Sequence, residues 1–465
     1  DANGIRWMIE PYFLLTIDWR TVAARAHVPG SEFWVRDLSA PPDPFAGDLT
    51  GPAPDTAALY GKPVVWAEAF TALPENSAWR NDPWTLKPVG DAAFCRGVNQ
   101  FVMHGFVHNP FRDDIRPGFS FGSWGTQLGR HVTWWPYASA WHRYLARCQY
   151  LLRQGVPVAD VLAYPPRIEH IPSSVLACTP YKQNVCNDET LLERLRVQDG
   201  RLVLPHGVSY AALAIPPAGL FAQRGMTPQA LRRILELVQD GATLIGEPVP
   251  ARSVSLQDYP RCDREMERLV DATWGEARAA TPGERAVGKG RVIWGQPVVK
   301  VLDNVAGGPD FEFVSVPQFA PGRSYNARYD FFHRRTPKAE IYFVANPRDE
   351  ALEATARFRV TGRVPQVWDP VTGRTRPLPE YQQDKGHTTV PMRLAPRQSL
   401  FIVFPGPSDG RPQTRNRRNF PVARPLAELG GPWQVAFDTR WGGPRQVEFA
   451  TLEDWTKRPE PGIRY

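Results

Sequence analysis

The chain lacks several features that would place it in a familiar class at once. It has only 5 cysteines among 465 residues, with no CxxC pair and no zinc-ligand spacing, so neither a zinc cage nor an obligatory disulfide framework is indicated. No stretch reaches the roughly 18 apolar residues of a membrane-spanning helix, and residues 171–305 contain no GxGxxG or GxxxxGK phosphate loop. The sequence therefore predicts no membrane span and no phosphate site in that region.

Strong charge of one sign is also missing. The formal net charge of +7 is spread along the chain, and the richest basic run, residues 411–424, lies among prolines and asparagines without interleaved aromatic residues. Such a run is typical of a solvated linker, so no nucleic-acid partner is expected. With 42% hydrophobic and 22% charged residues, the composition indicates a globular chain of about two to four domains.

The first 170 residues alternate short apolar runs, which end in polar or charged residues, with helical stretches. This alternation predicts the C-terminal portion of a β/α-barrel catalytic domain over residues 1–170. One helix is expected at about 137–154, ended by Gly155; its apolar stripe consists of Trp141, Tyr144, Leu145, Cys148, Leu151 and Leu152. A complete barrel takes about 250 residues, so its early strands are expected upstream of Asp1.

The pattern changes after residue 170. Residues 171–305 predict an open α/β accessory domain, in which a strand at 209–215, a helix capped by Thr227 and starting at Pro228, and a strand at 242–245 form a βαβ unit. Residues 306–406 predict a β-sandwich-like domain with strands near 339–345, 356–360, 366–368 and 399–404. A linker at 407–429 and the start of a truncated β module of the sugar-binding type at 430–465 follow. The expected fold class is α/β plus β: part of a TIM-like barrel, an open α/β domain, and β-sandwich-like modules.

Three carboxylates stand out in the barrel-like region. Glu10, Glu32 and Glu68 each lie in or just after a strand-like run and next to an aromatic residue. Strand ends of a β/α barrel converge on one face, and paired carboxylates beside aromatic rings are what a glycosidase needs to protonate a leaving oxygen and activate water. The alternative is structural, since a single strand-end Glu often pairs with an Arg or caps a helix.

The stretch 94–135 is the richest in polar and aromatic loop residues. Asn99 and His104 can read sugar hydroxyls, and Trp134 and Trp135 can face a sugar ring. The His104-x-x-x-His108 spacing is not interpreted as a zinc pair, because Gly105 and Asn109-Pro110 break the helix that such a pair requires. Alternatively, one His is buried and hydrogen-bonded, and the Trp pair anchors the following helix.

Several of these motifs, taken together and in order, resemble glycoside hydrolase family 106, the α-L-rhamnosidase family. They are Glu10-Pro11-Tyr12, Ser31-Glu32-Phe33-Trp34, the block from Tyr60-Gly61-Lys62 to Ala67-Glu68-Ala69-Phe70-Thr71, Gly97-Val98-Asn99-Gln100-Phe101 with His104, and Thr133-Trp134-Trp135. The resemblance continues through Arg147-Cys148-Gln149 and Ala159-Asp160-Val161 to Gly431-Pro432-Trp433.

The resemblance implies an inverting β/α-barrel hydrolase of α-L-rhamnosides that uses a Glu acid, a Glu base and calcium. By motif, Glu68 resembles the general base, Glu32 a carboxylate near the Ca2+ ion, and Glu10 and His104 residues that line the sugar pocket. The family's acid is expected on an earlier strand, upstream of Asp1. The partner is then a rhamnosylated glycan or glycoside, and a periplasmic or secreted location is expected from that function.

Two other interpretations stay open. The chain could belong to another barrel glycosidase, such as a β-galactosidase-like enzyme with an α/β accessory domain, or it could be a non-catalytic carbohydrate-binding protein. The chain starts at Asp1 in mid-pattern and ends at Tyr465 just before an expected strand. We therefore expect a fragment that lacks both ends and has weak or no activity by itself, because half a barrel would leave its site incomplete.

Overall fold

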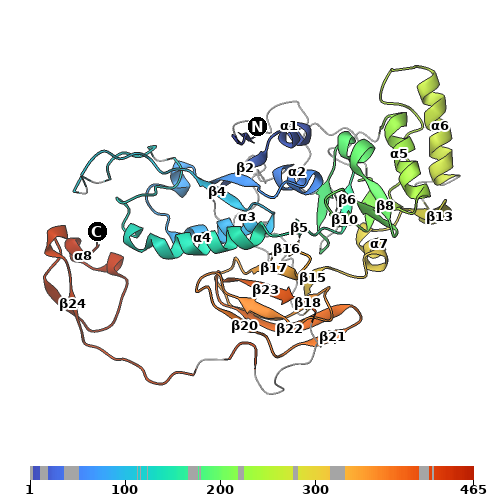
Figure 1. Ribbon diagram of the computed structural model, residues 1–465. Helices are drawn as coiled ribbons and strands as arrows, with labels where there is room; N and C mark the ends of the chain where they lie inside the picture. The colour runs from blue at the N-terminus through green and yellow to red at the C-terminus, as the bar shows by residue number, and fades with distance from the viewer. Residues whose placement is uncertain are drawn as a thin grey trace. The chain divides into compact units, whose positions relative to one another are not determined.

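The protein divides into two compact units, Asp1–Asn419 and Phe420–Tyr465 (Figure 1). The computed structural model describes residues 4–10, 19–35, 52–112, 114–115, 117–122, 124–165, 176, 180–217, 225–275, 281–314, 330–407, 418–421 and 424–464. Most of the basic run expected as a linker, including Arg415 and Arg417, lies outside these residues. Among the described helices, none has the length and apolar character needed to span a membrane.

The first sheet contains four parallel strands in chain order. They are β1 (Met8–Ile9), β2 (Val28–Trp34), β3 (Trp66–Thr71) and β4 (Gln100–Met103), and α1 (Trp19–Arg25), α2 (Pro52–Tyr60) and α3 (Pro83–Cys95) lie between them along the chain. Helix α3 begins at a reciprocal cap, in which Asp82 Oδ1 accepts from the Thr85 amide at 2.8 Å and Thr85 Oγ1 accepts from the Asp82 amide at 3.0 Å. The predicted alternation of strands and helices is present.

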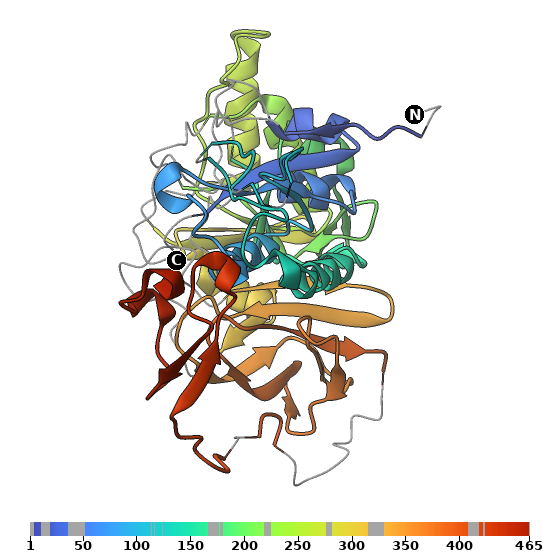
Figure 2. The ribbon, with the colours of Figure 1, turned by 90° about the vertical axis from the view of Figure 1, so that its left-hand side faces the viewer.

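Helix α4 (Ala138–Leu152) follows the expected apolar stripe closely. Five of the six stripe residues are buried, and Leu151 is partly buried against the same core. The helix starts one residue later than predicted, after a 3₁₀ turn at Trp135–Tyr137, and ends at Leu152, with Gly155 at φ +57° shortly beyond. Figures 1 and 2 both place α4 between the parallel sheet and the antiparallel strands of residues 311–405.

A six-stranded sheet in the order β13-β14-β12-β11-β6-β7 forms the α/β region. Its strands are β6 (Val161–Ala163), β7 (Gln183–Val185), β11 (Ala212–Ala214), β12 (Thr243–Ile245), β13 (Gly283–Val287) and β14 (Gly290–Trp294), and only the β13–β14 pair is antiparallel among the described pairings. Helices α5 (Pro228–Gln239), α6 (Arg261–Trp274) and α7 (Val298–Val305) belong to this region. Strand β6 precedes residue 171, where the second domain is predicted to begin.

The βαβ prediction in this region is confirmed. Thr227 Oγ1 accepts from the Ala230 amide at 3.2 Å, Pro228 opens α5, and β11 and β12 on either side of the helix are parallel. The strand predicted at 209–215 is wrong in one respect, because it is split. Its first part, β10 (Ser209–Tyr210), pairs instead with β9 (Arg201–Val203), which also pairs with β8 (Arg196–Gln198). A π-helical turn at Thr190–Arg194 precedes β8.

Two antiparallel sheets follow. One has the order β15-β18-β22-β21, made of β15 (Phe311–Phe313), β18 (Leu352–Phe358), β22 (His387–Leu394) and β21 (Gln382–Asp384). The other has the order β20-β19-β23-β17-β16-β5, made of β20 (Thr375–Pro377), β19 (Gln366–Trp368), β23 (Ser399–Pro405), β17 (Ala339–Ala345), β16 (Asp330–Arg335) and β5 (Val156–Pro157). Apolar residues of β17 and β23 share one core with α3 and α4. The β-rich expectation for this region is met.

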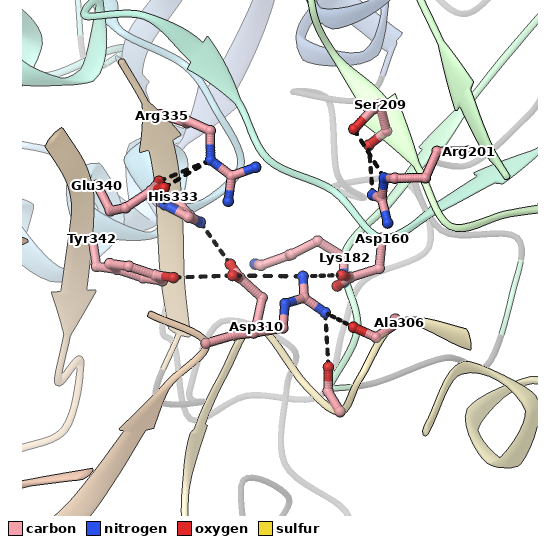
Figure 3. A network of polar contacts seen from close by, with 12 residues as sticks. Asp160, Lys182, Arg201, Ser209, Ala306, Asp310, His333, Arg335, Glu340 and Tyr342 are labelled. Atoms are coloured by element: carbon pink, nitrogen blue, oxygen red, sulfur yellow. Dashed lines mark hydrogen bonds and ion pairs between the residues drawn. The ribbon is translucent and has the colours of Figure 1, made fainter. Parts of the chain in front are cut away.

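A buried polar network joins the α/β sheet to the antiparallel strands (Figure 3). His333, in β16, contacts Asp310 Oδ2 and Glu340 Oε2 through its two ring nitrogens, at 2.8 Å each. Asp310 also accepts from Tyr342 Oη at 3.0 Å, and the Arg359 guanidinium lies between Asp310 and Asp160. We call His333, Asp310, Glu340, Arg359 and Asp160 the junction network.

The second unit is built around one hairpin. Strands β24 (Trp433–Ala436) and β25 (Gln446–Phe449) are antiparallel, and the short helix α8 (Pro461–Arg464) follows 3₁₀ turns at Thr439–Trp441 and Trp455–Lys457. The Phe437 ring lies 5.0 Å from that of Trp455, and the Arg458 guanidinium lies 4.4 Å from the Phe449 ring centre. The aromatic residues thus supply the small core of this unit.

Candidate active site

The carboxyl ends of the four parallel strands bring together most of the predicted site residues. Glu10 directly follows β1, Glu32 lies in β2, Glu68 in β3, and His104 directly follows β4. Glu32 and Glu68 are register partners, so their side chains lie on the same face of strands about 4.8 Å apart. His104 Nδ1 is 3.3 Å from Glu68 Oε1. We call Glu10, Glu32, Glu68 and His104 the strand-end cluster.

A bulge in β3 shapes this end of the sheet. Phe33 pairs with Ala69 and Trp34 with Thr71, which leaves Phe70 unpaired at φ +64°. A bulky residue in this conformation is strained, and burial of its ring against Phe33, at 5.0 Å between centroids, holds it there. The bulge turns Thr71 so that its hydroxyl lies 3.2 Å from His104 Nδ1.

Glycine is required where β2 meets β3. Gly30 is the register partner of Trp66, and a Cβ atom at Gly30 would lie 2.2 Å from the Trp66 indole nitrogen. Any larger residue would therefore push the indole away from β2, two residues from the Glu32–Glu68 pair. This close approach sets the spacing of the two strands that carry the central carboxylates.

Burial and neighbouring negative charges raise the pKa of two carboxyl groups in the strand-end cluster. Burial, followed by the negative charges of Glu32 and Glu68, raises the pKa of Glu10 to about 8. Burial also raises the pKa of Glu68, an effect that His104 opposes and Glu32 reinforces. At neutral pH Glu10 is therefore mainly protonated and able to donate a hydrogen bond. Perturbed carboxylates at strand ends are typical of functional sites.

Asn99 is not brought to this end of the sheet. It precedes β4, about 10 Å back along the strand from the level of Glu68, and only 1% of the residue is exposed. Its Oδ1 accepts from the Val65 amide at 2.8 Å, and its Nδ2 donates to the Pro63 carbonyl at 3.0 Å. Substrate binding by Asn99 is thus corrected to a structural role at the amino ends of β3 and β4.

Trp134 and Trp135 lie before α4 and are partly buried. Trp134 Nε1 donates to the Asn81 carbonyl at 3.0 Å, and its ring packs against the core shared by α3 and α4. The Trp135 ring lies 5.8 Å from that of Phe106 and 5.6 Å from that of His142. Anchoring of the helix accounts for Trp134, while Trp135 also contacts the loop that follows β4.

A pocket of about 200 Å³ lies in the loop after β4. We call it the loop pocket; its lining includes Trp79, Gly105, Phe106, His108, Asn109, Phe119, Ser120, Phe121, Trp124, Gln127, Arg130 and His131. Phe121 connects it to the strand-end cluster, because its ring centroid lies 5.6 Å from that of His104. Thr71 and Phe121 were not predicted to lie near the site. The sequence features that could have pointed to them are the Thr71 hydroxyl three residues after Glu68 and the position of Phe121 in a loop rich in Gly and Ser.

The carboxylates of the cluster are the type of ligand that Ca2+ binds, but the described residues supply too few of them for a complete site. Carboxylate oxygens are the hard ligands that Ca2+ takes, and the negative charges of Glu32 and Glu68 lie close enough to Glu10 to raise its pKa. Over the described residues, however, no group of three or more His, Cys, Asp or Glu side chains is arranged to hold a metal ion. The described part of the chain therefore offers Glu32 and its neighbours as a partial ligand set.

Comparison with known proteins places these features in context. The family model of glycoside hydrolase family 106, described as alpha-L-rhamnosidase, matches residues 14–383. The solved structure of a rhamnosidase from Novosphingobium sp. PP1Y has a TM-score of 0.79 at 31% identity, covering 96% of this chain and 41% of that one. A curated Formosa agariphila protein that carries a beta-glucuronidase name is 31% identical over 438 residues, which are 92% of this chain and 34% of that protein. The chain spans less than half the length of either relative.

Proposed function

The chain belongs to glycoside hydrolase family 106, the alpha-L-rhamnosidases, and on this premise we propose that its strand-end cluster serves the hydrolysis of terminal α-L-rhamnosides with inversion. The observation that carries the proposal is the gathering of Glu10, Glu32 and Glu68 from three neighbouring parallel strands. Strand ends of this kind hold the chemistry of β/α barrels. The four-stranded sheet would then be the C-terminal part of such a barrel.

Glu68 is assigned the role of general base. A water molecule attacks the anomeric carbon and gives one proton to the Glu68 carboxylate, while the glycosidic C–O bond breaks and the leaving oxygen takes a proton from an acid across the site. Inversion places these two carboxyl groups about 6.5–9.5 Å apart. The raised pKa of Glu68 brings it closer to working pH, where a general base is most effective. His104, 3.3 Å from Oε1, holds the carboxylate in position.

Glu10 is assigned to the sugar pocket. Its pKa of about 8 keeps it protonated at neutral pH, so it suits donation of a hydrogen bond to a sugar hydroxyl. The general acid is proposed on another strand of the complete barrel. Hydrolysis by residues 1–465 alone would assign the acid to Glu10 instead, because a carboxyl group protonated at pH 7 is what that role needs.

Calcium is proposed at Glu32. The buried Glu32 carboxylate, 4% exposed, would supply one ligand, and further oxygen ligands would come from neighbouring groups. When bound, the ion would supply positive charge that favours the ionised form of Glu68, the proposed base. His104 would contact the sugar together with Glu10, and the ring of Trp134 or Trp135 would pack against the methyl group of rhamnose.

Substitution of Glu68 tests the proposal. In the complete gene product, Glu68→Gln should lower kcat for 4-nitrophenyl α-L-rhamnoside by about 10²–10⁴-fold, the usual contribution of a positioned base. Glu75→Gln, in the turn that follows the same strand, is the matched control and should retain activity. Unchanged turnover by Glu68→Gln, in a protein that melts like the wild type, would refute the assignment.

The beta-glucuronidase name of the Formosa relative supports a second candidate function. Activity on a 4-nitrophenyl β-glucuronide without activity on the rhamnoside would favour it. A β-galactosidase-like enzyme would act on galactosides with retention, which NMR of the first-formed anomer distinguishes from inversion. Binding of rhamnosides without any hydrolysis would favour a non-catalytic carbohydrate-binding protein. The proposed partner in each case is a carbohydrate, and a periplasmic or secreted location is proposed from that function.

A further inference from the structure

The loop pocket adjoins the strand-end cluster directly. Gly105, the residue after His104, lines it, and the Phe121 ring lies both in its wall and 5.6 Å from the His104 ring. The Thr126 amide donates to the His104 carbonyl at 2.8 Å, and the Gly105 amide donates to the Thr126 carbonyl at 3.0 Å. These two bonds connect the pocket lining to the end of β4. A ligand held at His104 and extending past it would therefore enter this pocket.

The inner wall of the pocket is held in place by buried polar contacts. Ser77 Oγ donates to the Gly125 carbonyl, and Gln127 Nε2 donates to Ser77 Oγ at 3.1 Å. Gln127 Oε1 accepts from the Trp79 amide at 2.9 Å. Trp79 adopts φ +60°, which is strained for so large a residue. The contacts made by Gln127 and Ser77 compensate for this strain and present the Trp79 indole to the pocket.

Gly125 joins the pocket wall to the cluster. It has φ +68°, and a Cβ atom there would lie 2.9 Å from the His104 carbonyl oxygen. Only glycine permits both this conformation and this close approach. The connections after β3 and β4 therefore meet at a fixed distance from His104, as expected of a preformed ligand site rather than of a loose loop.

The lining combines aromatic faces with polar groups, which include the guanidinium of Arg130. Phe106, Phe119, Phe121 and Trp124 are exposed by 65%, 56%, 64% and 46%, so their rings are not packed into the core. Asn109, Ser120 and His108 supply hydrogen-bonding groups between them, and no Asp or Glu is among the described lining residues. Aromatic faces with interspersed donors and acceptors suit a sugar ring, which has apolar C–H faces and a hydroxyl rim.

We infer that the loop pocket is the subsite for the sugar residue to which the rhamnose is attached, so that the preferred substrate is a rhamnosylated glycan. The inference rests on the proposed function. The pocket volume of about 200 Å³ is below the roughly 300–1,000 Å³ typical of sites for drug-sized ligands, which suits a single ring. The terminal rhamnose then occupies the strand-end cluster, and the next sugar lies against Trp124 and Phe121.

Calorimetric titration of the complete gene product with Glu68→Gln, which prevents hydrolysis, tests the inference. The ligands are methyl α-L-rhamnoside, an α-L-rhamnosyl-glucose disaccharide and phenyl α-L-rhamnoside. The disaccharide should bind at least about tenfold more tightly than the methyl glycoside, and Trp124→Ala should remove about tenfold of this gain while changing the methyl glycoside by less than twofold. Tyr150→Ala is the control, since this exposed aromatic ring on α4 lies outside the pocket.

Three results would overturn the inference: equal affinity for the disaccharide and the methyl glycoside, an unchanged disaccharide affinity in Trp124→Ala, or a gain with the phenyl glycoside as large as that with the disaccharide. The last would assign the pocket to aromatic aglycones. A thermal melt of Trp124→Ala checks its folding, and Phe106→Ala serves if that variant melts early. Hydrolysis of the ligands in the Glu68→Gln background would instead refute the proposed role of Glu68 and leave the comparison of affinities intact.

Discussion

Two groups of carboxylates in the first unit have opposite electrostatic surroundings. In the strand-end cluster, burial and neighbouring carboxylates raise the pKa of Glu10 and Glu68. In the junction network, burial would raise the pKa of Asp310 and Glu340, but His333 and nearby arginines more than offset it and lower both values, whereas burial raises the pKa of Asp160 despite its contact with Arg359. Carboxylates held by His333 and arginines thus stabilise the fold, whereas the raised pKa values in the strand-end cluster cost stability and support the functional role proposed for it.

The largest effect should come from removing one carboxylate of the junction network, compared with one carboxylate of an exposed ion pair. Asp310→Asn leaves His333 and Arg359 buried without their shared carboxylate, so the free energy of unfolding should fall by about 3–5 kcal/mol, measured by urea denaturation. Glu353→Gln, which breaks only the exposed pair with Arg393 at 3.2 Å, should cost less than about 1 kcal/mol. A loss of similar size in both variants would show that the junction network contributes no more to stability than an exposed ion pair.

The two groups should also differ in their response to acid, because only the junction network contains carboxylates with lowered pKa values. The lowered pKa values of Asp310 and Glu340 give stability that is present above about pH 4.5 and is lost as pH falls through their folded values. Burial lowers the pKa of His333, but Asp310 and Glu340 outweigh it and raise it above 6.5, so its contribution is lost as pH rises beyond that. The contacts of His333 with Asp310 and Glu340 should therefore stabilise the protein most between about pH 4.5 and 6.5.

In the strand-end cluster, the raised pKa of Glu10 means that the folded protein loses stability as pH rises from 4.5 through about 8. Glu10→Gln should remove this part of the alkaline loss: its free energy of unfolding should match the wild type near pH 5 and exceed it by up to about 1 kcal/mol near pH 9. Denaturation at the two pH values measures the difference. A variant less stable than the wild type at pH 9 would show that Glu10 is held by an ion pair.

The smallest expected effect concerns calcium. If Glu32 supplies a ligand, millimolar Ca2+ should raise the melting temperature of the complete gene product by a few degrees, because the ion binds only the folded state. Glu32→Gln should abolish the shift, whereas Glu353→Gln, at an exposed carboxylate on β18, should keep it. Equal shifts in both variants would place the ion elsewhere.

Local rules predicted much of this architecture, and the family resemblance is confirmed by the match over residues 14–383. Helix α5 begins at Pro228 after Thr227 because cap and proline act locally, and the stripe of α4 follows from helical periodicity. The split of 209–215 was not predicted, because β10 forms a hairpin with the neighbouring β9, while β11 pairs with the distant β6. Sequence patterns also do not show that Asn99 is buried, with its Nδ2 donating to the Leu152 carbonyl at 3.3 Å.

In the candidate site too, features set by local sequence were predicted, and features set by distant contacts were not. Alternation of apolar runs located Glu10 and His104 directly after strands, because that signal is short-range, whereas Glu68, predicted at the end of its strand, lies inside β3. The Phe70 bulge, which brings Thr71 to His104, depends on packing of its ring against Phe33 and Phe101, which come from other strands. The loop pocket likewise depends on contacts between Ser77 and Gln127, which lie 50 residues apart. Sequence patterns located the reactive groups but not the contacts that position them.

Chemical rescue tests the central claim most directly, namely that Glu68 activates the attacking water. Glu68→Ala in the complete gene product should be inactive on 4-nitrophenyl α-L-rhamnoside, and azide should restore turnover, since the anion attacks without a base and fits the space left by the carboxylate. NMR should identify β-L-rhamnosyl azide as the product, as inversion requires. Hydrolysis by Glu68→Ala at the wild-type rate, or an α-configured azide, would contradict the account.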